Sequence, residues 1–169
     1  FVADTDQLDS LTEDSVDMMR EETWKFIRRE MYDDVSGGGW KSSYTGEWLS
    51  REVMDDYANN ALEKVKPFVD STSRVLEIGC ASGITMFQVA PLIEHYVGTE
   101  IEQDILNWTE QEARKRSLTN FDLHQLAAHE IGDLKESGFD LIIINSVLQC
   151  FSGHQYLKQV LQLCMEKLS

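Results

Sequence analysis

Hydrophobic and polar positions follow two different patterns along the chain, and the change comes near residue 71. Before that point apolar residues recur only at helical spacing, whereas after it short apolar runs alternate with helical stretches. We therefore divide the chain into an amino-terminal helical lid with its linker, residues 1–70, and a core domain, residues 71–169.

The core domain is predicted to alternate strand and helix. Strands are expected at 74–79, 95–100, 121–128 and 139–147, and helices at 84–94, 102–116, 130–136 and 154–168. The run Leu141–Ile144 is apolar throughout, which is typical of a parallel strand covered on both faces. This order predicts an α/β fold in which an open, mostly parallel sheet carries helices on both faces and has right-handed connections.

Two amphipathic helices are predicted in the lid. The first runs from Val16 to about Asp33, and the acidic stretch before it is interpreted as a solvated linker. The run Gly37–Gly39 then interrupts regular structure. Ser50 is expected to cap the second helix, which continues to about Val65.

Charge limits the classes of partner. The chain has 30 Asp and Glu residues against 15 Lys and Arg, a formal net charge of -15, and a field of this sign disfavours nucleic acid. No apolar run approaches the roughly 20 residues that span a bilayer, and no signal peptide is visible. Cys80, Cys150 and Cys164 are odd in number and far apart, which argues against disulfides and a zinc site. We expect no metal, no membrane association and a cytoplasmic location.

The first strand of the core ends in a turn rich in small residues, VLEIGCASG, in which Gly79, Ala81 and Gly83 alternate with other residues. Glu100 ends the next strand, 21 positions beyond Gly79, where an acid is placed to bind ribose hydroxyls. The pattern predicts an adenosine-containing cofactor. The phosphate-loop signature is absent, and a dinucleotide fingerprint would have a third glycine where this chain has Ile84.

With Glu77 in front of it, the turn reads ExGxAxG, which resembles the first motif of the class I S-adenosylmethionine-dependent methyltransferases, here with Ala81 in place of the middle glycine. The segments SSYTGE, VLEIGCASG, VGTE and FDLIIINSVLQCF follow one another in the order found in methyltransferase domains of nonribosomal peptide synthetases and polyketide synthases. The resemblance covers roughly Trp40 to the end and implies a Rossmann-like methyltransferase core.

The resemblance also implies a set of site residues. Tyr44 would close over the methionine end of S-adenosylmethionine, Glu100 would bind its ribose, and Asn145 and Ser146 would lie near its sulfonium. The full set implied for the cofactor is Tyr44, Glu77, Gly79, Ala81, Gly83, Glu100, Ile101, Ala128, Asn145 and Ser146. Trp40 and Gln149 are predicted to contact the methyl acceptor.

The acceptor atom depends on the base. His129 follows the third strand and has a side chain suited to general-base catalysis, and Glu47 would orient it if the lid folds over the site. An equally weighted alternative is that His129 only frames adenine. The turn after the fourth strand has Gln149 but no His of the kind typical of carbon-methylating synthase domains, and no NPPY-like turn. Oxygen or nitrogen is therefore favoured as acceptor. Oxygen is preferred because His129 offers a base, and nitrogen is the alternative.

The resemblance implies an acyl or peptidyl carrier protein as partner, presenting a phosphopantetheine-linked substrate, with neighbouring megasynthase domains. Two readings from other classes stay open, a nicotinamide-dependent oxidoreductase and a non-catalytic remnant. A complete fold of this family has seven strands, whereas four are predicted before Ser169. We expect either further residues or a partner segment at the sheet edge.

Overall fold

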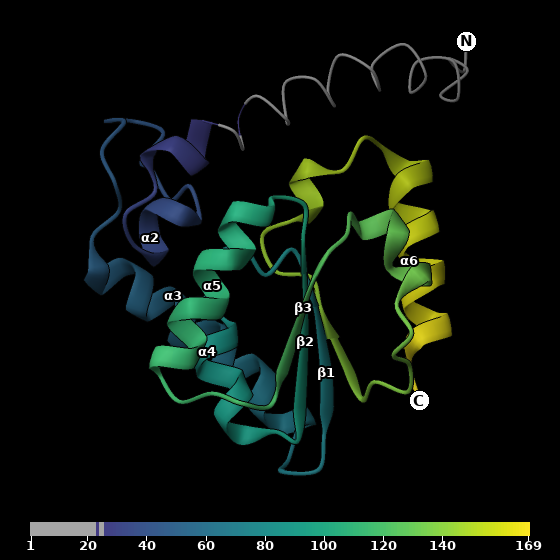
Figure 1. Cartoon of the computed structure of the whole chain (residues 1–169). Helices are drawn as coiled ribbons and strands as arrows, with labels where there is room; N and C mark the ends of the chain where they lie inside the picture. Colours follow the sequence, from purple (N-terminus) through teal and green to yellow (C-terminus); the bar gives the residue numbers. More distant parts are fainter. Residues whose placement is uncertain (1–22, 24–25) are drawn as a thin grey trace, which may run out of the picture.

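The computed structural model describes Thr23 and residues 26–169, so the acidic linker and the predicted start of the first helix lie outside the described residues. Its centre is a parallel sheet of four strands in the order β3-β2-β1-β4 (Figure 1). The strands are β1 (Arg74–Ile78), β2 (His95–Glu100), β3 (Phe121–Gln125) and β4 (Leu141–Ile143). The predicted open parallel α/β sheet is confirmed.

The strand order reverses at β1. The chain moves outward from β1 to β2 and β3, and then returns to place β4 on the other side of β1. Loops from two adjacent strands therefore diverge at the carboxyl ends of β1 and β4, which is where open sheets of this kind bind ligands.

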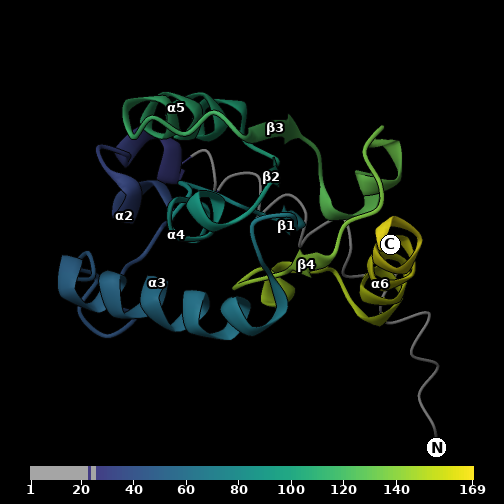
Figure 2. The same ribbon diagram turned by 90° about the horizontal axis from the view of Figure 1, so that it is seen from below.

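Helices cover both faces of the sheet (Figure 2). One face carries α3 (Arg51–Val65), α4 (Met86–Val89) and α5 (Gln103–Lys115), and the other carries η3 (Ala128–Asp133) and α6 (His154–Lys167). Alternate residues of each strand enter the two cores. On β1, for example, Val75 packs with α3 to α5, whereas Leu76 packs with η3 and α6.

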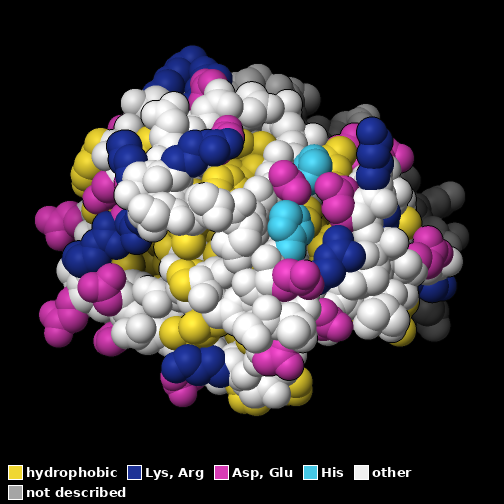
Figure 3. All heavy atoms as spheres, turned by 60° about the horizontal axis from the view of Figure 1, so that its bottom comes forward, with side chains coloured by type: hydrophobic (Ala, Val, Ile, Leu, Met, Phe, Trp, Pro, Cys, Tyr) yellow, Lys and Arg dark blue, Asp and Glu magenta, His cyan; other side chains and the backbone are white. Residues whose placement is uncertain are grey.

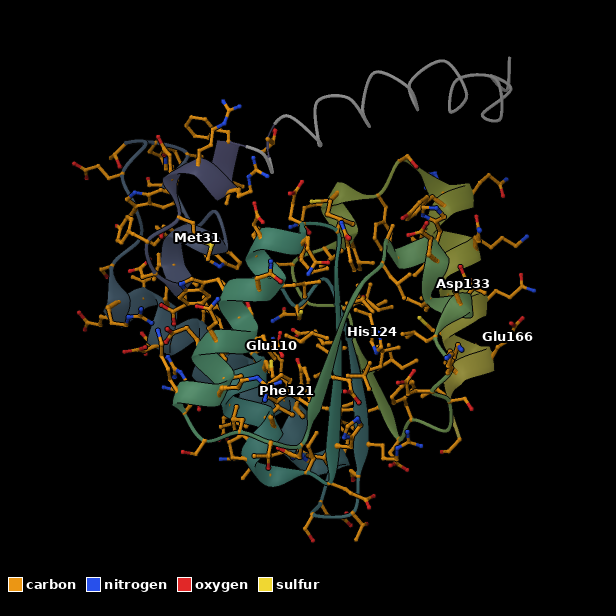
Figure 4. All side chains as sticks on the ribbon, viewed as in Figure 1. Met31, Glu110, Phe121, His124, Asp133 and Glu166 are labelled. Atoms are coloured by element: carbon orange, nitrogen blue, oxygen red, sulfur yellow. The ribbon has the colours of Figure 1, made fainter. Side chains whose placement is uncertain are left out.

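The same alternation places the side chains of the edge strand β3. Phe121 packs against the core under α5, and His124 points to the other face, where its ring lies 3.5 Å from the Glu136 carboxylate (Figure 4). His95 on β2 makes a similar contact of 3.0 Å with Asp122.

Several elements are shorter than predicted. The third strand ends at Gln125 rather than at residue 128, because the Glu130 carboxylate accepts the Ala127 amide at 2.8 Å and starts the 3-10 helix η3. That helix replaces the one predicted at 130–136. The fourth strand keeps only Leu141–Ile143 of the predicted 139–147.

The helix predicted at 84–94 is split into α4 and the 3-10 helix η2 (Ala90–Leu92). Pro91 stands in the first turn of η2 and has no amide hydrogen to continue the α-helical ladder. Two further 3-10 helices follow α3 and β4, namely η1 (Lys66–Phe68) and η4 (Leu148–Cys150).

The described part of the lid contains a helical stretch at residues 26–30, the short helix α2 (Asp34–Gly37) and α3. The first helix therefore ends earlier than predicted, because Asp33 and Ser36 form a capping box that starts α2. The predicted cap of α3 is confirmed, since the Ser50 hydroxyl accepts the Val53 amide at 3.3 Å.

Polar contacts attach the lid to the core. The Ser82 hydroxyl donates to the backbone carbonyl of Asp34, and Arg51 donates to the Asp34 carboxylate at 2.9 Å. Burial raises the pKa of Asp34, but the hydrogen bond and charge of Arg51 outweigh it and leave that pKa lowered. The lid is thus bound to the turn that follows β1.

Charged side chains of both signs are interspersed on the face drawn in Figure 3. In the described part of the chain no helix has the length and apolar character needed to cross a membrane.

Candidate active site

A cavity of about 710 Å³ opens at the carboxyl ends of β1, β2 and β4. Its walls come from the lid, from the turns after these strands and from the start of η3. The volume lies within the roughly 300–1,000 Å³ usual for sites that bind small molecules. The cavity occupies the point where the strand order reverses.

The turn after β1 forms the floor of the cavity, and its backbone explains its small residues. Gly79 has φ +73°, and its amide and that of Cys80 both donate to the Thr99 carbonyl, at 2.8 and 2.9 Å. Ala81 also lies in the left-handed region, with φ +43°, although it carries a Cβ. Ala81 thus adopts, with strain, the conformation that glycine would adopt freely.

Glu100 lies at the edge of the same turn, with 4% of its surface exposed. Its carboxylate accepts the amides of Ile101 at 2.7 Å and Ala81 at 3.2 Å. Burial raises the pKa of Glu100, and these backbone hydrogen bonds partly offset the effect. The carboxylate therefore both fixes the turn and lines the cavity, where it can accept a hydrogen bond from a ligand hydroxyl.

Glu77 is the second buried carboxylate of the cavity, with 2% of its surface exposed. The hydroxyls of Tyr96 and Thr85 donate to it, and the Asn145 amide lies 3.4 Å from Thr85 Oγ1. Burial raises the pKa of Glu77 to about 7, although the two hydrogen bonds lower it.

The described residues that line the cavity include no Lys or Arg. Two buried carboxylates without a basic neighbour favour a ligand with hydroxyl groups and a positive charge over one with phosphates. Of the described residues, none form a cluster of three or more His, Cys, Asp or Glu side chains arranged to hold a metal ion.

His129 lies at the η3 end of the cavity. Its Nδ1 atom is 2.9 Å from the hydroxyl of Tyr156 on α6, and Tyr156 also packs on Phe151 with 4.9 Å between ring centroids. All three side chains line the cavity. Neither Tyr156 nor Phe151 was predicted to be a site residue, because an aromatic residue in the largely apolar helix predicted at 154–168 is equally typical of the core.

The lid forms the opposite wall through Trp40 and Tyr57, whose ring centroids are 4.7 Å apart. The Tyr57 hydroxyl lies 3.0 Å from Ser146 Oγ, in the loop after β4. The helical pattern placed Tyr57 on the apolar face of its helix and gave it no functional role.

Most of the predicted site residues meet in this cavity. Those that line it are Trp40, Glu77, Gly79, Ala81, Glu100, Ile101, Ala128, His129, Asn145, Ser146 and Gln149. Three others are placed elsewhere. Gly83 packs against a helix, since a Cβ built on it would lie 2.9 Å from Thr109 of α5.

Tyr44 and Glu47 are the other two residues outside the cavity lining. They lie in a turn that is closed by the bridge between Lys41 and Trp48 and by the Gly46 amide donating to the Ser42 carbonyl at 2.8 Å. Tyr44 is 98% exposed. Glu47 is also exposed, and neither residue lines the cavity, so the predicted pairing of Glu47 with His129 is not present in the structure.

A family model described as a methyltransferase domain matches residues 76–169, more than half of the chain. The chain belongs to this methyltransferase domain family. The match begins within β1 and includes the turn, Glu100 and the loop after β4, which are the elements that build the cavity.

Two relatives are peptide synthetases. The chain is 32% identical over 86% of its length to a probable non-canonical nonribosomal peptide synthetase, CymA, of Salinispora arenicola. It is 29% identical over 83% of its length to chondramide synthase cmdD of Chondromyces crocatus. It spans only 2% and 4% of these two proteins, respectively.

Solved structures agree on the fold. The N-methyltransferase NodS of Bradyrhizobium japonicum, solved with S-adenosyl-L-homocysteine, aligns with a TM-score of 0.63 at 16% identity, covering 87% of this chain and 68% of NodS. At this identity the likeness concerns the fold alone. The Rossmann-like class I methyltransferase fold expected from the sequence is thereby confirmed.

Proposed function

We propose that this domain transfers a methyl group from S-adenosylmethionine to the nitrogen of an aminoacyl or peptidyl substrate carried by a carrier protein. The observation that carries the proposal is the cavity. It joins a turn suited to an adenosine ligand to an aromatic wall, and its described lining residues include no Lys or Arg. The similarity to peptide synthetases indicates the substrate class.

The residues of the cavity fit this cofactor. The Glu100 carboxylate would accept ribose hydroxyls, Ile101 and Ala128 would contact adenine, and Asn145 and Ser146 would face the sulfonium end. When bound, S-adenosylmethionine supplies an electrophilic methyl group on a positively charged sulfur. The buried Glu77 carboxylate complements that positive charge.

The main task of the protein is then to position the acceptor relative to the methyl group. The walls of the cavity would hold the acceptor nitrogen in line with the methyl–sulfur bond. With the cofactor bound, the nitrogen lone pair would take the methyl group, the electron pair of the methyl–sulfur bond would stay on sulfur, and the proton on nitrogen would leave to water. A neutral amine needs no base for this attack.

Our preference for nitrogen over oxygen rests on this difference in the need for a base. Oxygen was favoured by the sequence because His129 offered a base. In the structure His129 lies at the η3 end, within hydrogen-bond distance of Tyr156, while Trp40 and Tyr57 form the wall contributed by the lid. An amine acceptor fits this side of the cavity, where the Tyr57 hydroxyl of the lid lies 3.0 Å from Ser146 Oγ and the lid contributes no histidine.

The test uses carrier proteins loaded through phosphopantetheine with an aminoacyl group or with its 2-hydroxyacyl counterpart. Each is incubated with the domain and S-adenosylmethionine, and the mass gain is located by fragmentation. We expect a gain of one methyl group, about 14 Da, on the amine nitrogen. Methylation of the hydroxyacyl carrier alone would assign the oxygen instead, and lack of cofactor binding by calorimetry would reject both.

A further inference from the structure

Two hydroxyl groups meet at the lid side of the cavity although 89 residues separate them in the chain. Tyr57 comes from α3 in the lid, and Ser146 comes from the loop after β4. Their oxygens are 3.0 Å apart, and both side chains line the cavity. The pair therefore spans the opening between the lid and the core domain.

The orientation of Ser146 is maintained at a cost. Its φ of +58° lies in the left-handed region, which is unfavourable for a residue with a Cβ. The Gln149 side chain donates to the Ser146 carbonyl at 2.6 Å and helps to hold this conformation. Backbone strain of this kind is concentrated at ligand clamps and active sites.

The ring of Tyr57 is also held in place. It packs on Trp40 with 4.7 Å between centroids and an interplanar angle of 53°. Burial raises the pKa of Tyr57, and the negative charge of Glu77 adds to this effect, while the hydrogen bond with Ser146 lowers it. Tyr57 therefore stays protonated near neutral pH and acts as a neutral hydroxyl rather than as a base.

The hydrogen-bonding capacity of the pair is only partly used. Each hydroxyl has one donor hydrogen and can accept hydrogen bonds through its lone pairs, and the contact between them uses one donor and one lone pair. The remaining lone pairs lie on atoms that line the cavity. A neutral amine has N–H groups that such lone pairs accept, and its own lone pair then stays free to attack.

We propose that Tyr57 and Ser146 together position the acceptor amine, by accepting its N–H groups at the lid side of the cavity and aiming its lone pair at the methyl group. This inference rests on the proposed function and adds to it the pair of residues that orients the acceptor. Tyr57 is a positioning residue in this scheme, and Trp40 supports its ring.

The test compares Tyr57→Phe, Ser146→Ala and the double variant with Tyr32→Phe, which removes a tyrosine hydroxyl on an exposed residue outside the cavity lining. We expect kcat/KM for the aminoacyl carrier to fall roughly 10–100-fold in either single variant. The double variant should be little worse than the single variants, because the two hydroxyls act as one unit. Tyr32→Phe should match the wild type.

Three further readouts separate positioning from folding and from base catalysis. Calorimetry should give unchanged affinity for S-adenosylmethionine in Tyr57→Phe. Binding of the aminoacyl carrier in the presence of S-adenosylhomocysteine should weaken in both single variants. The shape of the pH–rate profile should stay that of the wild type, whereas removal of a base would change it.

The outcomes distinguish this inference from the function on which it rests. If the wild type methylates the amine and Tyr57→Phe has the same kcat/KM, the role of the pair is overturned and the proposed function stands. A wild-type domain that binds the cofactor but methylates no amine would overturn the proposed function and this inference with it.

Discussion

Val147 packs directly over the α carbon of Gly79, so closely that a Cβ built on Gly79 would lie 2.5 Å from Val147 Cγ2. The contact joins the turn after β1 to the loop after β4, which together form one side of the cavity. Two features of this position therefore require glycine, namely the backbone φ of +73° and the lack of space for a side chain.

Gly79→Ala should lower the free energy of unfolding by roughly 2–5 kcal/mol, the sum of left-handed strain and of overpacking against Val147. Denaturant titration measures the change, and calorimetry should show weakened cofactor binding. The matched control is Gly46→Ala, which has the same φ of +73° but no atom within 4 Å of the new Cβ. It should lose at most about 1.5 kcal/mol, because the smaller freedom of alanine in the unfolded chain offsets part of the left-handed strain. Equal losses in both variants would contradict the role of the Val147 contact.

Ala81→Gly should stabilise the domain. Its φ of +43° costs about 1–2 kcal/mol for alanine, whereas glycine gives back roughly 0.5–1 kcal/mol through its greater freedom in the unfolded chain. The free energy of unfolding should therefore rise by up to about 1.5 kcal/mol. Ser117→Gly, at φ +63° outside the cavity lining, should behave alike and leave cofactor affinity unchanged. A clear loss of stability in Ala81→Gly would show that packing of the Ala81 methyl group stabilises the fold by more than the backbone strain costs.

Glu77 should make the ligand-free domain less stable as the pH rises. Its pKa is raised from 4.5 to about 7 by burial, so between these values the folded state holds a proton that the unfolded state has lost. The contribution to stability is present below the unfolded value and is lost as the pH rises through the folded value, by about 3 kcal/mol in all. Denaturant titrations across this range measure it.

The control for Glu77 is Glu77→Gln, which cannot ionise and should flatten this part of the pH dependence of stability. The pKa of Glu100 is also raised by burial, and Glu100 contributes equally to the pH dependence of both proteins. A positively charged ligand favours ionised Glu77, so binding of S-adenosylmethionine should release protons near pH 7 in the wild type and fewer in the variant. Calorimetry in buffers of different ionisation enthalpy measures that release. Identical pH slopes in both proteins would show that Glu77 is ionised throughout.

His129→Ala should affect cofactor binding more than turnover. His129 lies at the cavity end with Tyr156, so its loss should weaken S-adenosylmethionine binding about three- to tenfold, equivalent to one lost hydrogen bond or packing contact. At saturating cofactor, kcat for an amine acceptor should fall by less than about tenfold, whereas loss of a general base costs about 10²–10⁴-fold. Tyr156→Phe keeps the ring, removes the hydroxyl and should reproduce part of the binding loss. A kcat loss of the larger size would restore His129 as a base.

Local patterns in the sequence were sufficient for much of the fold. The strand and helix order followed from periodicity, and Glu77 and Glu100 could be assigned to one site because carboxyl ends of parallel strands meet at the same edge of a sheet. The boundaries were less well predicted. The Glu130 side chain ends β3 early and Pro91 splits α4 from η2, which are effects of single hydrogen bonds that a periodic pattern does not contain.

The sequence by itself determined the class of fold, the turn that needs left-handed residues and the two acids beside it, because each depends on residues close together in the chain or on a regular strand order. Only the tertiary structure decided that Tyr57 meets Ser146, that His129 meets Tyr156, and that Tyr44 stays outside the cavity. Periodicity fixes which face of an element is apolar. It does not fix which elements abut, and that depends on packing between residues far apart in the chain.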